Sequence, residues 1–107
     1  MPPQIDILQG TVDVLILRAL SWEPMHGYAI SRWIRERSNE LLAVEGAALY
    51  QALHRLERKK LVGATWGASE NNRRAKFYEL TAEGKRHLRN ETQAWRAYSA
   101  AVTQVLA

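Results

Sequence analysis

The sequence predicts a mostly helical α+β domain in which three helices are followed by a β-hairpin and a fourth helix. Apolar residues recur at helical spacing in four segments, and a pair of asparagines separates two runs of strand-forming residues. The chain has 107 residues, of which 47% are hydrophobic and 24% charged, so it is long enough for one globular domain with a modest core.

The first two helices are expected at VDVLILRAL, from residue 12, and at Tyr28–Ser38, with the breaker SWEPMHG between them. Val14 and Leu17 lie off the main apolar stripe of the first helix. We therefore expect the core to cover one side of this helix and a partner subunit to cover another. The segment LLAV at 41–44 is too short for a helix and fits a small strand.

The third helix is expected from about Gly46 to Lys60 and has two contrasting faces. Leucines and an alanine form a narrow apolar stripe on one side. The other side carries polar residues at the same spacing: Gln51, Arg55 and Arg58, flanked by Tyr50 and His54. Such a helix is suited to contact a partner outside the domain.

A β-hairpin is expected next, with LVGATWGAS and RRAKFYEL as its strands and ENN at its tip. Asparagine tolerates left-handed backbone, so Asn71 and Asn72 suit a tight turn.

The last helix is expected to begin after Thr81, a good N-cap, and to run to the end of the chain. Gly84 occupies the position where a capping box would have Glu or Gln. Leu88, Trp95 and Val102 recur every seven residues, a spacing typical of a stripe that packs against another helix. A large indole on this stripe needs a cover, and a second copy of the chain would provide one.

The charge is distributed unevenly. The formal net charge is +4, but residues 51–90 contain 10 Lys/Arg and 4 Asp/Glu, whereas residues 1–50 contain 4 Lys/Arg and 6 Asp/Glu. A basic block of net charge +6 in a small domain favours a polyanionic partner such as nucleic acid. A solvated surface that happens to be basic is the alternative.

Three helices followed by a hairpin is the order of a winged helix-turn-helix domain, here with an added C-terminal helix. In that fold the third helix enters the major groove of DNA, and the hairpin reaches the neighbouring backbone or minor groove. Because some winged helices bind protein instead, an acidic protein partner stays open as the alternative. The predicted DNA contacts are Tyr50, Gln51, His54, Arg55, Arg58, Asn72, Arg73, Arg74 and Lys76; for Tyr50, packing on the second helix is the competing interpretation.

Four blocks of sequence occur in a characteristic order over nearly the whole chain: GTVDVLILRAL, HGYAISRWI, ALYQALHRLE and SENNRRAKFYELTAEG. Together they resemble the PadR family of bacterial transcriptional regulators. The resemblance implies a homodimer, joined through the first and last helices, that usually represses a nearby promoter by binding an inverted repeat. On this interpretation residues 1–80 form the DNA-binding domain, and residues 81–107 form a C-terminal dimerisation helix packed on the same domain.

Four positions depart from the pattern associated with that family. Ala47 and Ala48 replace a Gly and a Ser or Thr, which removes one hydroxyl donor to phosphate. Gln51 replaces a proline and can pair with adenine. Lys60 replaces the glycine that usually ends the helix, which costs about 1 kcal/mol where the backbone is left-handed. These departures concern the operator and the affinity, not the fold.

Trp95 has two interpretations. It packs in the dimer seam, as large aromatics at interfaces do, or it lines a pocket for a flat ligand with Tyr98 and Trp22. Because members of the family respond to phenolic or drug-like compounds, the resemblance adds a small aromatic effector as a partner, with an effector-independent repressor as the alternative. Other aromatics near the DNA face are expected to pack within the domain: Tyr28, Phe77 and Tyr78.

The sequence contains no recognisable catalytic or metal site. It has no cysteine and no Gly-rich phosphate loop. Glu83 and His87 are four residues apart on one helix but have no third ligand, and His26 and His54 have no metal-spaced partners. We therefore expect no enzymatic activity, no cofactor and no metal. No apolar run approaches the roughly 18 residues of a membrane span, and no signal peptide is visible, so we expect a cytoplasmic protein without membrane contact.

Overall fold

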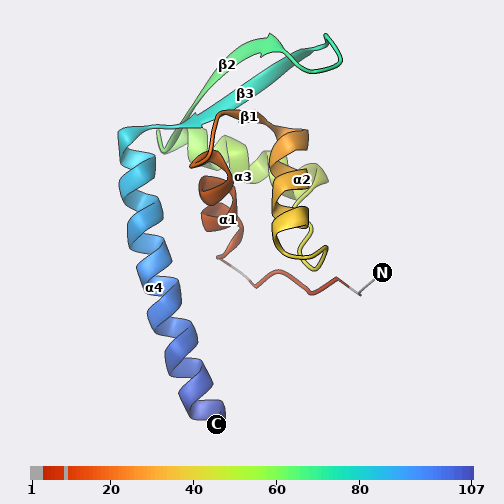
Figure 1. Cartoon of the computed structure of the whole chain (residues 1–107). Helices are drawn as coiled ribbons and strands as arrows, with labels where there is room; N and C mark the ends of the chain where they lie inside the picture. The colour runs from red at the N-terminus through yellow and green to blue at the C-terminus, as the bar shows by residue number, and fades with distance from the viewer. Residues whose placement is uncertain (1–3, 9) are drawn as a thin grey trace.

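The computed structural model describes residues 4–8 and 10–107, and Figure 1 shows the arrangement of their helices and strands. In chain order the elements are α1 (Val12–Leu20), β1 (Met25–His26), α2 (Gly27–Arg37), α3 (Gly46–Arg58), β2 (Val62–Ala68), β3 (Arg74–Leu80) and α4 (Ala82–Leu106). The predicted α+β class, winged-helix order and added C-terminal helix are confirmed.

The core lies where α1, α2 and α3 meet under the sheet. Ile16 of α1, Ile30 of α2 and Leu53 of α3 are completely buried. Tyr78 on β3 is also buried and covers this cluster from the side of the hairpin. The predicted division of α3 into a leucine face and a polar face follows from this packing.

The sheet has three antiparallel strands in the order β1-β3-β2. β2 and β3 form the expected hairpin, in which Trp66 is opposite Lys76 and Ala64 is opposite Tyr78. The third strand comes from the segment between α1 and α2, where Met25 pairs with Tyr78. The strand expected at 41–44 does not form. There the chain lies in irregular backbone, and the Ile5 N–H donates to the Leu41 carbonyl at 2.8 Å.

The C-terminus of α3 is closed by a left-handed residue. Lys60 has a φ of +61°, its N–H donates to the Glu57 carbonyl, and the Leu61 N–H donates to the Leu56 carbonyl, both at 3.0 Å. These two bonds form a Schellman motif, which usually has glycine at the left-handed position. The left-handed backbone considered for Lys60 is therefore present.

α4 begins at the end of the hairpin and is joined closely to the end of α3. The Thr81 hydroxyl accepts a hydrogen bond from the Gly84 N–H at 3.0 Å, so Thr81 is the N-cap as predicted. A Cβ added at Gly84 would overlap the Leu61 carbonyl oxygen, which explains why a larger capping-box residue is absent there.

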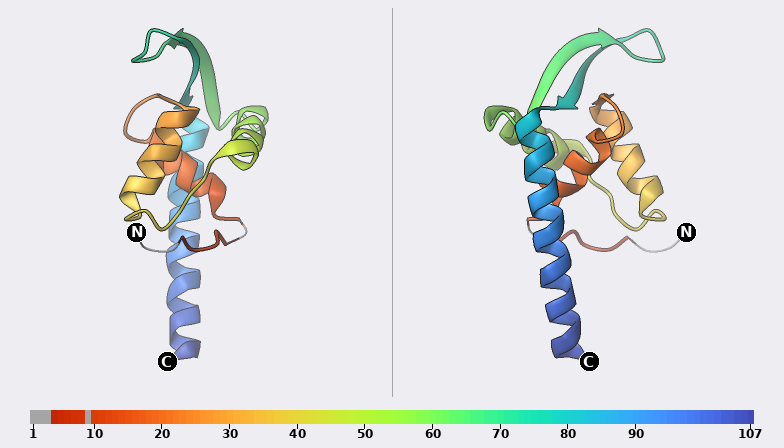
Figure 2. Two further views of the ribbon diagram at one scale, coloured as in Figure 1. Left: turned by 90° about the vertical axis from the view of Figure 1, so that its right-hand side faces the viewer. Right: turned by 60° about the vertical axis from the view of Figure 1, so that its left-hand side comes forward.

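Two features project from the three-helix body. The β2–β3 hairpin rises away from α2 and α3, and α4 continues well beyond the end of α1 (Figure 2). Among residues 4–8 and 10–107, no helix combines the length and apolar character that a membrane crossing requires.

Candidate nucleic-acid interface

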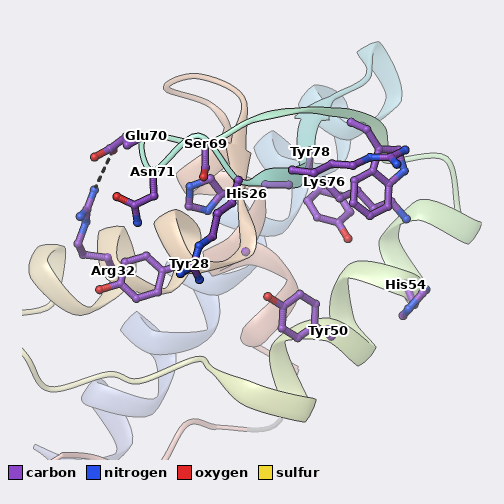
Figure 3. Close-up of a pocket in the computed structure, with 15 residues that line it drawn as sticks. His26, Tyr28, Arg32, Tyr50, His54, Ser69, Glu70, Asn71, Lys76 and Tyr78 are labelled. Atoms are coloured by element: carbon purple, nitrogen blue, oxygen red, sulfur yellow. Dashed lines mark ion pairs between the residues drawn. The ribbon is translucent and has the colours of Figure 1, made fainter.

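A cavity of about 740 Å³ separates the inner face of the hairpin from α2 and α3 (Figure 3). It is open to solvent, and Tyr50 and His54 of α3 lie on one side of it, with Lys76 of β3 on another. Its cationic and aromatic lining residues are Arg32, Arg73, Arg74, Lys76, His26, His54, Tyr28, Tyr50, Trp66 and Tyr78. We call this cavity the wing groove.

The structure brings five of the nine predicted DNA contacts to the wing groove: Tyr50, His54, Arg73, Arg74 and Lys76. Gln51 and Arg58 are exposed on α3 outside the groove lining. Asn72 is at the tip of the hairpin, with a φ of +57° and its N–H bonded to the Ser69 carbonyl at 2.8 Å. The predicted turn at the asparagines is therefore confirmed.

Two of the predicted contact cations are engaged by carboxylates of the same chain. Arg55 donates from Nη2 to Oδ1 of Asp13 at 2.5 Å and from Nε to Oδ2 at 3.3 Å. Lys76 donates from Nζ to Oε1 of Glu57 at 3.1 Å. Hydrogen bonding to Asp13, followed by charge attraction, raises the pKa of Arg55, and the hydrogen bond to Glu57 is the main cause that raises the pKa of Lys76.

The other three cations are differently placed. Arg58 and Arg73 have no ion-pair partner within residues 4–8 and 10–107. The Arg74 guanidinium lies over the Trp66 ring, 4.7 Å from the ring centroid. A cation held over an indole keeps its charge while the aromatic face restricts its orientation.

Tyr50 packs on the start of α2, where Gly27 provides the space. A Cβ at Gly27 would lie 2.7 Å from the Tyr50 hydroxyl, so any larger residue would displace the phenol. About half of the Tyr50 surface stays exposed toward the groove. Packing of Tyr50 on the second helix, one of the two interpretations of this residue, is thus present. Phosphate contact by the Tyr50 hydroxyl stays a prediction.

Comparison with known proteins identifies the family of this chain. Residues 16–90 match the transcriptional regulator PadR-like family. The chain belongs to the PadR family. It is accordingly a DNA-binding transcriptional regulator and not an enzyme.

Solved structures agree with this assignment. A transcriptional regulator from Clostridium thermocellum superposes with a TM-score of 0.83 at 29% identity, covering 94% of this chain and 97% of that one. A PadR family transcription regulator from Clostridium difficile R20291 gives a TM-score of 0.78 at 36% identity, covering 92% and 100%. Among sequences, an uncharacterized protein X of Lysinibacillus sphaericus is 33% identical over 90 residues, 84% of this chain and 83% of its own length.

Three aromatic residues of this PadR-family domain were expected to pack internally, and one does not. Tyr78 is buried, and Phe77 meets the His26 ring edge-on with centroids 5.3 Å apart. Tyr28, however, is 63% exposed, with the Arg32 guanidinium 5.7 Å from its ring centroid. The prediction was wrong for Tyr28 because residue 28 lies in the first turn of α2, at the mouth of the wing groove.

Sequence reasoning also missed residues that shape the groove. Trp66 is 59% exposed, although its position opposite Lys76 on paired strands could have placed it on the groove face. Gly27 could have been noticed because it directly precedes the helix expected from Tyr28, although its contact with Tyr50 exists only in the folded chain. Arg32 and Glu70, which form an ion pair of 3.9 Å between α2 and the hairpin, offered no comparable signal.

The residues proposed for an effector fall into two places. Trp95 and Tyr98 lie together on α4 with ring centroids 6.3 Å apart. Trp22 instead has the Arg37 guanidinium of α2 at 5.5 Å from its ring centroid. A pocket shared by all three stays a prediction. In the part of the chain that the structure describes, no group of three or more acidic or histidine side chains is arranged to hold a metal ion.

Proposed function

We propose that this regulator represses transcription by binding an inverted-repeat operator as a homodimer. The exposed side of α3 enters the major groove, where Gln51 and His54 approach base edges and Arg58 approaches phosphate. The Tyr50 hydroxyl meets a phosphate at the start of this contact. The hairpin contributes its tip residue and its two adjacent arginines to the neighbouring backbone or minor groove: Asn72, Arg73 and Arg74.

The observation that carries this proposal is the wing groove. Arg73 and Arg74 of the hairpin line the same cavity as Tyr50 and His54 on the exposed side of α3. A DNA strand lying along the edge of α3 would pass beneath these cations, so one backbone could be contacted by both elements. Phosphate neutralisation of this kind makes binding strongly dependent on salt.

A second copy of the chain is the proposed cover for α4. Leu88 is only 8% exposed because α4 packs there on α1 and β3. Trp95 and Val102 continue the same stripe but are 40% and 37% exposed. Residues 81–107 therefore serve as the dimerisation helix and residues 1–80 as the DNA-binding domain, in a protein that works in the cytoplasm where the DNA is.

Selection from random duplexes, followed by sequencing, tests this function. We expect an enriched palindrome whose half-sites lie about 34–36 Å apart, or a multiple of that distance. No enrichment at low salt would instead support an acidic protein as the partner. In the selected duplex, Arg73→Ala with Arg74→Ala should weaken binding at least tenfold, whereas Lys85→Ala with Arg89→Ala, an equal loss of charge on α4, should have little effect.

The proposed effector is a small aromatic compound that binds beside Trp95 and Tyr98 and releases the repressor from DNA. Titration with aromatic compounds, followed by tryptophan fluorescence, tests this part separately. A compound that both changes the fluorescence and dissociates the selected duplex supports it, and Trp95→Phe should abolish the fluorescence change. Fluorescence that responds equally in Trp95→Phe would exclude this site.

A further inference from the structure

The recognition helix α3 is attached to its neighbours through two ion pairs. On one side, Arg55 forms a two-pronged contact with Asp13 in the first turn of α1. On the other, Glu57 accepts a hydrogen bond from Lys76 on β3 at 3.1 Å. Both cations belong to the basic block that the charge pattern associates with DNA, yet each has a carboxylate of the same chain as its partner.

The geometry of the first pair favours a structural role. Two guanidinium nitrogens of Arg55 donate hydrogen bonds to the two oxygens of the Asp13 carboxylate. This bidentate contact restricts the orientation of the Arg55 side chain as well as its distance from Asp13. The Asp13 side chain is only 24% exposed, so removing its partner would leave a poorly solvated negative charge. Exchange of Asp13 for a DNA phosphate is therefore unfavourable for Arg55.

Pairing with a carboxylate also reduces the contribution of Arg55 and Lys76 to electrostatic binding of DNA. A cation that is already paired with a carboxylate contributes almost no net charge, so it releases few additional counterions from the duplex. A phosphate that approached Arg55 or Lys76 would also approach Asp13 or Glu57, and the like charges would repel. Arg58 and Arg73 lack such partners within the described ranges, 4–8 and 10–107.

We infer that Arg55 and Lys76 are positioning residues that hold α3 between α1 and the wing, while Arg58, Arg73 and Arg74 neutralise phosphates. This inference rests on the proposed function, because it concerns how the same DNA contact is built. α1 packs on α4, so the Asp13–Arg55 pair connects the proposed dimer side of the domain to the helix that reads DNA. The Glu57–Lys76 pair sets the wing relative to that helix.

Salt dependence separates the two groups of cations. The operator duplex recovered by selection, or a random-sequence duplex if none is enriched, is titrated by fluorescence anisotropy between low and moderate KCl concentrations. Arg58→Gln should reduce the slope of log K against log [KCl] by about 0.9 for each subunit. Arg55→Gln, the same charge loss three residues away on the same helix, should lower the affinity severalfold but leave the slope unchanged.

The wing offers a second matched comparison. Arg73→Gln should reduce the slope of log K against log [KCl] as Arg58→Gln does. Lys76→Gln should weaken binding but leave that slope unchanged. If Arg55→Gln or Lys76→Gln reduces the slope as much as its matched control, that residue contacts phosphate and the inference is overturned for it.

Thermal unfolding at one protein concentration tests the positioning role without DNA. Asp13→Asn and Arg55→Gln should each lower the midpoint by several degrees, and the double variant should be no less stable than the worse single variant. Additive effects would contradict the pairing. If the wild-type protein binds no duplex even at low salt, the proposed function fails together with the division of DNA contacts, while this cycle still decides whether Asp13 and Arg55 hold α3.

Discussion

The two halves of α4 lie on one continuous helix but meet different surroundings. Near its start, Gly84 and Leu88 are buried against the winged-helix body. Further along, Trp95 and Val102 occupy the same stripe but are substantially exposed. The heptad pattern is the same in both halves, so the periodicity alone does not reveal that the body covers one half and leaves the other to a partner.

The anchored half also fixes how α4 meets the recognition helix. The Thr81 hydroxyl donates to the Lys60 carbonyl at 2.7 Å, and the Thr81 N–H donates to the Leu61 carbonyl at 3.2 Å. Gly84 lies directly against the same Leu61 carbonyl. The end of α3 and the start of α4 therefore form one joint, and in a dimer built on α4 this joint would set the spacing of the two recognition helices.

The largest expected effect comes from filling that joint. In Gly84→Ala the new methyl would overlap the Leu61 carbonyl oxygen, a backbone atom that cannot rotate away, so α4 must shift. We expect the free energy of unfolding to fall by about 3 kcal/mol, as for severe overpacking. Chemical denaturation at a fixed protein concentration measures this loss.

The matched control for that change is Gly63→Ala on β2. A Cβ there would meet no atom within 4 Å, so the free energy of unfolding should change by less than about 0.5 kcal/mol. Equal losses in the two variants would show that the joint is not tightly packed.

The next largest effect should appear in the exposed half, and in association more than in folding. If Trp95 is the anchor of the dimer seam, Trp95→Ala should raise the dimer dissociation constant about thirtyfold, corresponding to about 2 kcal/mol. Sedimentation equilibrium measures this constant. Gln93→Ala, which changes the opposite side of the same helix turn, should leave it unchanged; unaltered association of Trp95→Ala would remove Trp95 from the seam.

Local signals predicted much of this molecule. The turn at Asn72 and the cap at Thr81 each depend on residues within a few positions of each other. The order of helices and hairpin followed from periodicity, and the two faces of α3 followed from the spacing of its leucines. These features predicted the fold and five of the residues that line the wing groove.

Features that depend on distant contacts escaped prediction. β1 has only two residues and exists because Met25 and His26 reach β3, whereas the apolar segment at 41–44 finds no strand to pair with. Asp13, the partner of Arg55, is 42 positions away in sequence, and no pattern in α3 indicates this contact. The reason for Gly84 is the Leu61 carbonyl, which only the folded chain brings close.

A smaller effect is expected from removing the hydroxyl at the joint. Thr81→Ala loses both the cap to the Gly84 N–H and the bond to the Lys60 carbonyl, and should cost about 1–2 kcal/mol of unfolding free energy. Thr92→Ala is the control, because the Thr92 hydroxyl only bonds back to the Leu88 carbonyl within α4. That variant should be neutral or slightly stabilising, since alanine is the better helix former. Chemical denaturation of both variants at equal protein concentration measures the difference between their unfolding free energies. A difference near zero would show that the Thr81 cap contributes little.

The smallest effect has the opposite sign and concerns Lys60. Its φ of +61° is unfavourable for a side chain with a Cβ, so Lys60→Gly removes about 1 kcal/mol of backbone cost. Greater freedom of glycine in the unfolded chain and loss of a cation at the helix C-terminus offset part of this gain, which leaves an expected stabilisation of about 0.5 kcal/mol. Lys59→Gly removes the same charge one residue earlier, where φ is −79°, and should destabilise instead. Both variants lose one positive charge, so they differ in the backbone conformation of the substituted residue. Opposite signs for the two changes in unfolding free energy would therefore be due to the backbone conformation. The same sign for both changes would show that charge dominates at this end of α3.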